Sequence, residues 1–156
     1  MSTKIQNILS RYVLDSRGFP TVEAEVLLSD GKRGKACVPS GASTGDKEAL
    51  ELRDLGNTWV GKGVEKALNS IQNHIAPHIV GESPFDIGGI DNMMINLDGT
   101  ENKSKLGANA ILAVSLANVR AGANSLNKSL FQYIKDSVNF KTEPMNMPVP
   151  MMNILN

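Results

Sequence analysis

The dipeptide Asp30-Gly31 separates two short runs in which apolar and polar residues alternate, and it constrains the fold more than any other stretch. Val and Ala occupy every second position in 22–26, and the same alternation recurs in 33–38. Asp-Gly between such runs predicts a β-hairpin, because both residues tolerate the positive φ of a tight turn. The apolar run "IQNILSRYVLD" ahead of the hairpin is expected to supply a third strand.

After residue 44 the spacing of apolar residues changes to that of helices. Helical spacing is found in 45–55, 63–80, 84–98, 106–126 and 129–138. The stretch 106–126 is rich in alanine and aliphatic residues nearly all round, which predicts a helix buried on most sides. Pro77 is expected to stop or kink the helix over 63–80. Strands followed by helices predict an α+β domain, with a small three-stranded antiparallel sheet packed against a helical cluster.

Charge and cysteine content exclude several classes of protein. Sixteen basic residues balance sixteen acidic ones, so no field of one sign favours nucleic acid or an anionic membrane. The single cysteine, Cys37, excludes an internal disulfide and a cysteine-based zinc site. No apolar run approaches the ~18 residues of a membrane span, and the N-terminus lacks the pattern of a secretory signal. We therefore expect a soluble, cytoplasmic protein with no nucleic-acid partner.

The C-terminal stretch combines prolines at 144, 148 and 150 with the apolar run "MMNIL". The prolines indicate a linker, and the apolar run is typical of the start of a buried strand. That strand could pair back onto the sheet, or a second domain could start here; an unpaired apolar strand edge exposed to water favours the second interpretation. We expect one domain over 1–140, followed over 141–156 by a linker and the first strand of another.

The stretch "VPSGASTGD", residues 38–46, is the one loop whose composition suggests binding. Its centre consists of Ser40, Gly41, Ala42, Ser43, Thr44 and Gly45. The glycines permit close backbone approach, and a loop between a strand and a helix can turn backbone N–H groups toward an anion. The lysine of a phosphate-binding P-loop is absent. Residue types alone favour a plain connection, in which Thr44 or Asp46 caps the next helix.

The remaining polar candidates have simpler structural explanations. His74 and His78 are separated by a proline, so a metal pair is not expected. The acidic groups of Glu23 and Glu25, and of residues 48, 51 and 54, have basic neighbours and are expected to form solvated ion pairs. Cys37 is expected to be half-buried, Arg17 to anchor a turn, and Lys103 and Lys105 to lie in an exposed loop. None of these groups completes a catalytic set.

Several long stretches, taken in order, resemble the enolase family. They are "RYVLDSRGFPTVEAEV", "VPSGASTGDKEALELRD", "GKGVEKALNSI", "LDGTENKSKLGANAILAVSLA" and "PVPMMNILN". The resemblance runs through nearly the whole chain and implies the α+β N-terminal domain of an enolase. In that family an α/β barrel follows, and "PVPMMNILN" would be its first strand. The departures, among them Phe19 in place of the usual asparagine and Leu55 in place of a glycine, concern turns and packing.

The resemblance also implies an activity. Enolases (phosphopyruvate hydratases) are magnesium-dependent lyases of glycolysis that reversibly dehydrate 2-phosphoglycerate to phosphoenolpyruvate. The catalytic lysine, the glutamates and the main ligands of the two magnesium ions come from the barrel. We therefore expect no catalytic residue in these 156 residues, no magnesium bound to them alone, and no activity of the fragment.

What the resemblance assigns to this chain is a lid and dimer contacts. The segment Ser40–Gly45 corresponds to a lid over the active site, and Ser43 corresponds to a ligand of the second magnesium. Arg11 and Glu23 correspond to contacts with the other subunit of a homodimer or higher homo-oligomer. The alternative is a stand-alone binding or assembly module derived from enolase.

Overall fold

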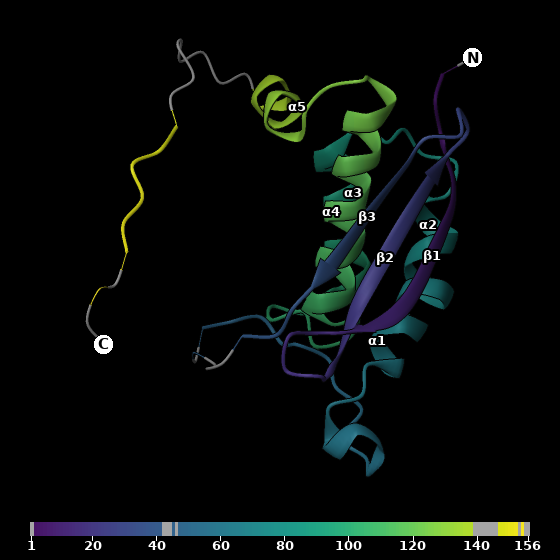
Figure 1. Ribbon diagram of the computed structural model, residues 1–156. Coiled ribbons are helices and arrows are strands. Elements are labelled where there is room, and N and C mark those ends of the chain that lie inside the picture. The colour runs from purple at the N-terminus through teal and green to yellow at the C-terminus, as the bar shows by residue number, and fades with distance from the viewer. Residues whose placement is uncertain (1, 42–44, 46, 139–146, 153, 155–156) are drawn as a thin grey trace.

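One antiparallel sheet with the strand order β1-β2-β3 forms one side of the protein (Figure 1). The computed structural model describes residues 2–41, 45, 47–138, 147–152 and 154. The strands are β1 (Ile5–Leu14), β2 (Pro20–Leu28) and β3 (Arg33–Val38). The predicted hairpin is confirmed: Gly31 has a φ of 81°, and Leu28 N donates to Lys32 O at 2.8 Å.

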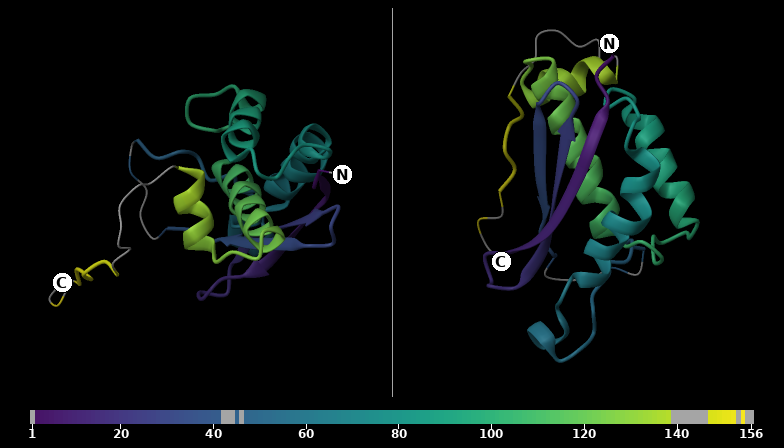
Figure 2. Two further views of the ribbon diagram at one scale, coloured as in Figure 1. Left: turned by 90° about the horizontal axis from the view of Figure 1, so that it is seen from above. Right: turned by 90° about the vertical axis from the view of Figure 1, so that its right-hand side faces the viewer.

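The helices follow the sheet in sequence, and α1 to α4 cover one of its faces (Figures 1 and 2). They are η1 (Thr58–Gly61), α1 (Glu65–Asn69), η2 (Ser70–Ile75), α2 (Ala76–Ile79), α3 (Ile87–Asp98), α4 (Ala108–Ser125) and α5 (Leu130–Ser137). This arrangement confirms the predicted α+β class with a three-stranded antiparallel sheet. None of the helices in the described part of the chain combines the length and hydrophobicity that a membrane crossing requires.

Small residues bring α4 unusually close to the sheet. Ala113, Ala117 and Ala121 of α4 are fully buried, and Gly34 of β3 lies against the same helix. A Cβ on Gly34 would collide with the backbone of Ala117 and Ala121, so no larger residue fits there without moving the helix. The alanine-rich pattern of the sequence is thus explained by backbone-to-backbone packing of one strand and one helix.

The helix predicted over 63–80 passes through Pro77 rather than stopping there. Pro77 is the second residue of α2, and the six residues before α2, Ser70–Ile75, form a π-helical stretch. The π-type turns have wider hydrogen-bond spacing than an α-helix. This local change accommodates a residue that has no N–H to donate. Of the two expected outcomes, a stop or a kink, the helix does not stop at Pro77 itself: it changes to π-type turns before it and ends two residues after it, at Ile79.

The helix predicted over 45–55 is wrong, since the described residues of that stretch contain none. Their backbone groups are used in tertiary hydrogen bonds instead. Leu50 N donates to Asn102 O at 2.7 Å, and Leu50 O accepts from Ala108 N at 2.8 Å. Asp54 N donates to Gly63 O at 3.0 Å. These bonds hold the segment in a non-helical form along the start of α4, and they overrode the local helical pattern.

At the C-terminal end, residues 147–152 and 154 belong to no helix or strand. The side chains of Met147, Val149, Met151 and Ile154 are largely exposed. Residues 139–146, where the proposed boundary falls, lie outside the described residues.

We predict that Gly34→Ala lowers the free energy of unfolding by about 2 kcal/mol, because the added methyl group forces β3 away from α4. Gly88→Ala is the matched control. Gly88 lies in α3, and a Cβ added to it would meet no other atom within 4 Å. Because alanine favours a helix more than glycine does, the same change there should be neutral or slightly stabilising. Urea unfolding of both variants measures the difference, and equal stabilities would contradict the close packing.

Candidate functional site

The loop that the sequence singles out begins where β3 ends. Of its six residues the structure describes Ser40, Gly41 and Gly45, and Ala42, Ser43 and Thr44 lie outside the described residues. The sequence also predicts that Thr44 or Asp46 caps a following helix. That prediction is wrong, because residues 47–55 contain no helix to cap.

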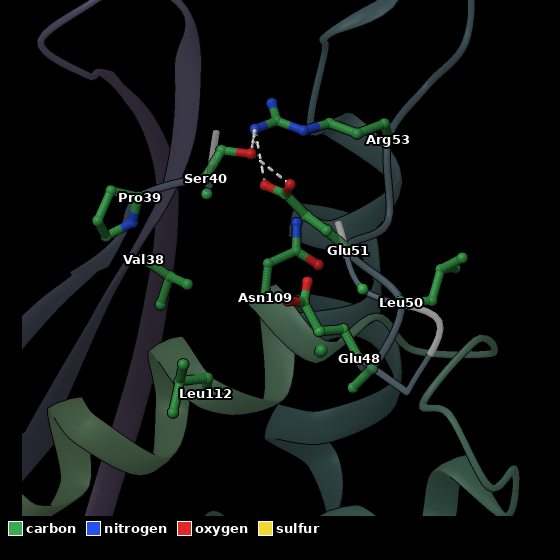
Figure 3. Close-up of a pocket in the computed structure, with 13 residues that line it drawn as sticks. Val38, Pro39, Ser40, Glu48, Leu50, Glu51, Arg53, Asn109 and Leu112 are labelled. Carbon is green, nitrogen blue, oxygen red and sulfur yellow. Dashed lines mark hydrogen bonds and ion pairs between the residues drawn. The ribbon is translucent and has the colours of Figure 1, made fainter. Parts of the chain in front are cut away.

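A hollow of about 750 Å³ lies beneath the start of this loop (Figure 3). Its walls are the end of β3, the non-helical segment that contains Glu51, and the first turns of α4. Polar side chains from all three converge on it, namely Ser40, Glu48, Glu51, Arg53 and Asn109. Leu112 of α4 forms an apolar wall on the opposite side (Figure 3).

Ser40 is held by two charged side chains. Its hydroxyl donates to one carboxylate oxygen of Glu51, and Arg53 Nη2 donates to Ser40 Oγ at 3.1 Å. The same Nη2 lies 2.7 Å from the other Glu51 oxygen, which closes a three-membered cluster. Figure 3 shows the three side chains turned toward one another. We refer to Ser40, Glu51 and Arg53 as the Ser40 cluster.

The other end of the Arg53 guanidinium is bound to backbone carbonyls. Nη1 donates to Pro20 O at 2.7 Å and to Lys62 O at 2.5 Å. The Arg53 side chain is only 13% exposed. The planar fork of arginine permits this simultaneous bonding in two directions, which a lysine could not provide. Arg53 therefore connects the loop start to the beginning of β2 and to the segment before α1.

Asn109 bonds the backbone of Leu52, the residue between Glu51 and Arg53. Its Oδ1 accepts from Leu52 N at 3.1 Å, and its Nδ2 donates to Leu52 O at 3.1 Å. Asn109 is 3% exposed, so these bonds satisfy a buried amide and a buried stretch of backbone together. Sequence reasoning missed Asn109 and the Ser40 cluster. The available signal was an asparagine among alanine and isoleucine in the first turn of a helix rich in apolar residues.

The outer face of the sheet carries a network of ion pairs. Arg11 Nε donates to Glu23 Oε1 at 2.6 Å, and Arg11 Nη2 lies 3.0 Å from Glu25 Oε2. Glu25 is also 3.3 Å from Arg33 and 3.6 Å from Lys35. The two residues expected to contact another subunit, Arg11 and Glu23, are thus paired with each other in this chain. The expectation of solvated pairs is wrong for Glu25, which is 5% exposed.

The network changes the pKa of an acidic residue, Glu25, and of a basic residue, Arg11. Burial raises the pKa of Glu25, but the hydrogen bond from Arg11 and the charges of Lys35, Arg11 and Arg33 outweigh burial, so the pKa is lowered overall. Hydrogen bonds to Glu25 and Glu23 raise the pKa of Arg11. The carboxylate of Glu25 is therefore ionised in the folded protein wherever this network is intact.

The other sequence candidates are not brought into the site. His78 Nδ1 bonds the backbone oxygen of His74 at 2.7 Å, and both residues are exposed. Lys103 and Lys105 donate to carbonyls of their own loop and of α3. Within the described residues, no three histidine, cysteine, aspartate or glutamate side chains are grouped to hold a metal ion.

Two expectations about single residues are refined. Cys37 is exposed rather than half-buried, and its Sγ lies 3.3 Å from Glu23 Oε2. Desolvation of the sulfur, followed by the Glu23 contact, raises the pKa of the thiol, the opposite of what an activated thiolate requires. In the turn after β1, Asp15 rather than the Arg17 side chain is the anchor, because its carboxylate accepts from the N–H groups of Arg17 and Phe19.

Comparison with known proteins decides the family. The family model described as "Enolase, N-terminal domain" matches residues 5–134 of the sequence. The chain belongs to the enolase N-terminal domain family. It is also 54% identical over 154 residues to the protein named "Enolase" from Elusimicrobium minutum (strain Pei191), which covers 99% of this chain. The chain spans only 36% of the length of that enolase.

We predict that Glu25→Gln destabilises the fold by about 2 kcal/mol at pH 7, since it removes hydrogen bonds to a buried charged group. The folded-state pKa of Glu25 is lowered, so its stabilisation is present above the unfolded pKa of about 4.3 and is lost as the pH falls through the folded value. The gap between variant and wild type should therefore be smaller at pH 3 than at pH 7.

The control is Asp136→Asn, which removes an exposed ion pair with Lys128 and should have little effect at either pH. Urea unfolding at the two pH values gives the comparison. A gap for Glu25→Gln that does not change with pH would contradict the ionised network.

Proposed function

We propose that the chain is the N-terminal domain of a longer cytoplasmic enolase, a lyase of glycolysis that interconverts 2-phosphoglycerate and phosphoenolpyruvate. The observation that carries the proposal is the 54% identity to an enolase across 99% of the chain, while the chain accounts for only 36% of that enolase. In this proposal the domain covers residues 1–140, and 141–156 lead into a barrel.

An exposed apolar pair on α4 is consistent with a domain that packs against the rest of a larger protein. Leu112 and Leu116 lie one turn apart on α4 and are 46% and 40% exposed. They form an exposed apolar pair on α4, and Leu112 lines the hollow beneath the loop (Figure 3). Contact with the rest of the enolase would remove these side chains from water.

In the proposed enzyme the segment Ser40–Gly45 acts as a lid. A lid closes over bound substrate, excludes water and completes the catalytic arrangement. The described ends of the segment, Gly41 and Gly45, are exposed and carry no Cβ, which suits a segment that must change its backbone conformation.

Magnesium would be held only partly by this chain. Mg²⁺ requires about six oxygen ligands in octahedral geometry, and the described residues offer no cluster of acidic side chains for it. We propose that the Ser43 hydroxyl contributes one ligand to the second of two ions and that the other ligands, the catalytic lysine and the glutamates come from the remainder of the enolase.

We further propose a homodimer or higher homo-oligomer in which Arg11 and Glu23 contact the other subunit. Each of the two residues has an opposite charge close by within its own chain, at 2.6 Å from Arg11 Nε to Glu23 Oε1. Charges from another subunit would therefore have to compete with this internal pair.

We predict that Ser43→Ala in the full-length enolase raises the magnesium concentration needed for half-maximal rate and lowers the maximal rate by about 10-fold, as the loss of a metal contact does. Ser29→Ala, an exposed serine at the other end of the hairpin, is the control and should change neither quantity. An unchanged magnesium dependence in Ser43→Ala would count against a ligand role.

The isolated 156-residue chain is expected to show no turnover of 2-phosphoglycerate at any magnesium concentration. An absorbance assay for phosphoenolpyruvate, run beside the full-length enolase, tests this. Clear turnover by the chain alone would overturn the proposed division of labour.

A further inference from the structure

We infer that Glu51 and Arg53 are positioning residues: they fix Ser40, and with it the point at which the segment bearing Ser43 leaves the sheet. The inference rests on the proposed function in one respect, namely that this segment takes part in the reaction. The contacts that support it involve only described residues. They are the hydroxyl of Ser40, both carboxylate oxygens of Glu51 and Nη2 of Arg53.

The segment after the loop is not helical where the two charged side chains meet. In a helix, residues i and i+2 are turned away from each other, whereas here both Glu51 and Arg53 bond Ser40. The backbone N–H and C=O of Leu52 between them are both bonded to the Asn109 side chain. The helix that the local sequence predicts would separate them and leave Ser40 without partners.

The geometry also separates positioning from general stability. Arg53 Nη1 binds the carbonyls of Pro20 and Lys62, and these bonds join parts of the framework. Nη2 and the Glu51 carboxylate are directed to Ser40 instead, at the rim of the hollow (Figure 3). Glu51 is only half-buried, with 32% of its side chain exposed, so its replacement does not leave a cavity in the core. Ser40→Ala removes the positioning contacts, Glu51→Gln removes the negative charge and one of the two acceptor oxygens, and both keep the framework bonds.

The loop is short enough for Ser40 to matter to Ser43. Three residues span at most about 10 Å, so a shift in the direction of the chain at Ser40 is carried to the position three residues later. A metal ligand must lie within a few tenths of an ångström of its place. Supporting contacts around metal sites typically change affinity by about 10-fold to 100-fold when they are removed.

The first test uses the 156-residue chain and needs no activity. Trypsin cleavage after the exposed Lys47 reports how often the segment opens. Ser40→Ala should raise the cleavage rate at Lys47 about fivefold, the change in open population that follows the loss of one such hydrogen bond. Ser40→Thr keeps the hydroxyl and should restore the wild-type rate.

The matched control is Ser125→Ala, which removes a hydroxyl–carboxylate bond of 2.6 Å to Asp30 at the far end of the hairpin. It should leave cleavage at Lys47 unchanged. If Ser40→Ala also leaves it unchanged, the cluster does not hold the segment and the inference is overturned.

The second test uses the full-length enolase. Ser40→Ala and Glu51→Gln should raise the magnesium concentration for half-maximal rate about 10-fold, with Ser40→Thr close to wild type and thermal unfolding little changed. A purely structural role would lower the unfolding temperature and leave the magnesium dependence alone, which would overturn the inference.

The two tests separate this inference from the proposed function. If the wild-type full-length protein lacks enolase activity, the proposed function fails, and cleavage at Lys47 still decides whether the Ser40 cluster holds the segment. If the wild type is active and the variants match it in both tests, the proposed function stands and the positioning role fails.

Discussion

The arrangement around the loop depends on one buried amide, that of Asn109. It exchanges two hydrogen bonds with the backbone of Leu52 and so replaces the helical bonds that the segment would otherwise make. Burial of an unpaired amide costs roughly 1–3 kcal/mol, so pairing is favourable both for the Asn109 side chain and for the Leu52 backbone. On either side of the bonded Leu52, Glu51 and Arg53 both contact Ser40, from which we infer that they position the start of the loop.

The position of Asn109 is in turn set by the close contact between α4 and the sheet. Gly34 lies against the backbone of α4, and buried alanines occupy the rest of the contact, so the helix has little freedom to slide. Its first turn is thereby held beside the end of β3. The hollow beneath the loop and its polar lining follow from this packing (Figure 3). The geometry of the site therefore depends on the packing of α4 against the sheet.

Much of the fold could be predicted from the sequence because its signals are local. Asp30-Gly31 between alternating runs predicts a β-hairpin, and the alanine-rich stretch 106–126 predicts a buried helix. The failure at 45–55 has a different origin. Its apolar spacing fits a helix, but the backbone partners of Leu50 and Leu52 come from residues about 50 positions later, which no local pattern reveals. Similarly, Glu25 alternates with Ala24 and Val26 in sequence, which indicates a solvent-facing side chain, and only the three-stranded register surrounds it with three cations.

The candidate site could be predicted only by resemblance. Residue types in "VPSGASTGD" favoured a plain connection, and the family resemblance, since confirmed, gave the loop its proposed role as a lid. The sequence pattern predicts that the charges that contact Ser40 lie on a solvated helix, because it does not reveal the non-helical form of residues 47–55. Whether Ser43 binds a metal stays a prediction.

The central claim is that the segment after the loop is held in a non-helical form by hydrogen bonds to α4 and to neighbouring backbone. Backbone chemical shifts and amide hydrogen exchange of residues 47–55, measured by NMR on the 156-residue chain, test it most directly. The structure predicts non-helical shifts for 50–54, with slow exchange of the amides of Leu50, Leu52 and Asp54, whose N–H groups are bonded to Asn102, Asn109 and Gly63. Helical shifts over this stretch, or exchange of these amides at the rate of an unfolded chain, would contradict the account.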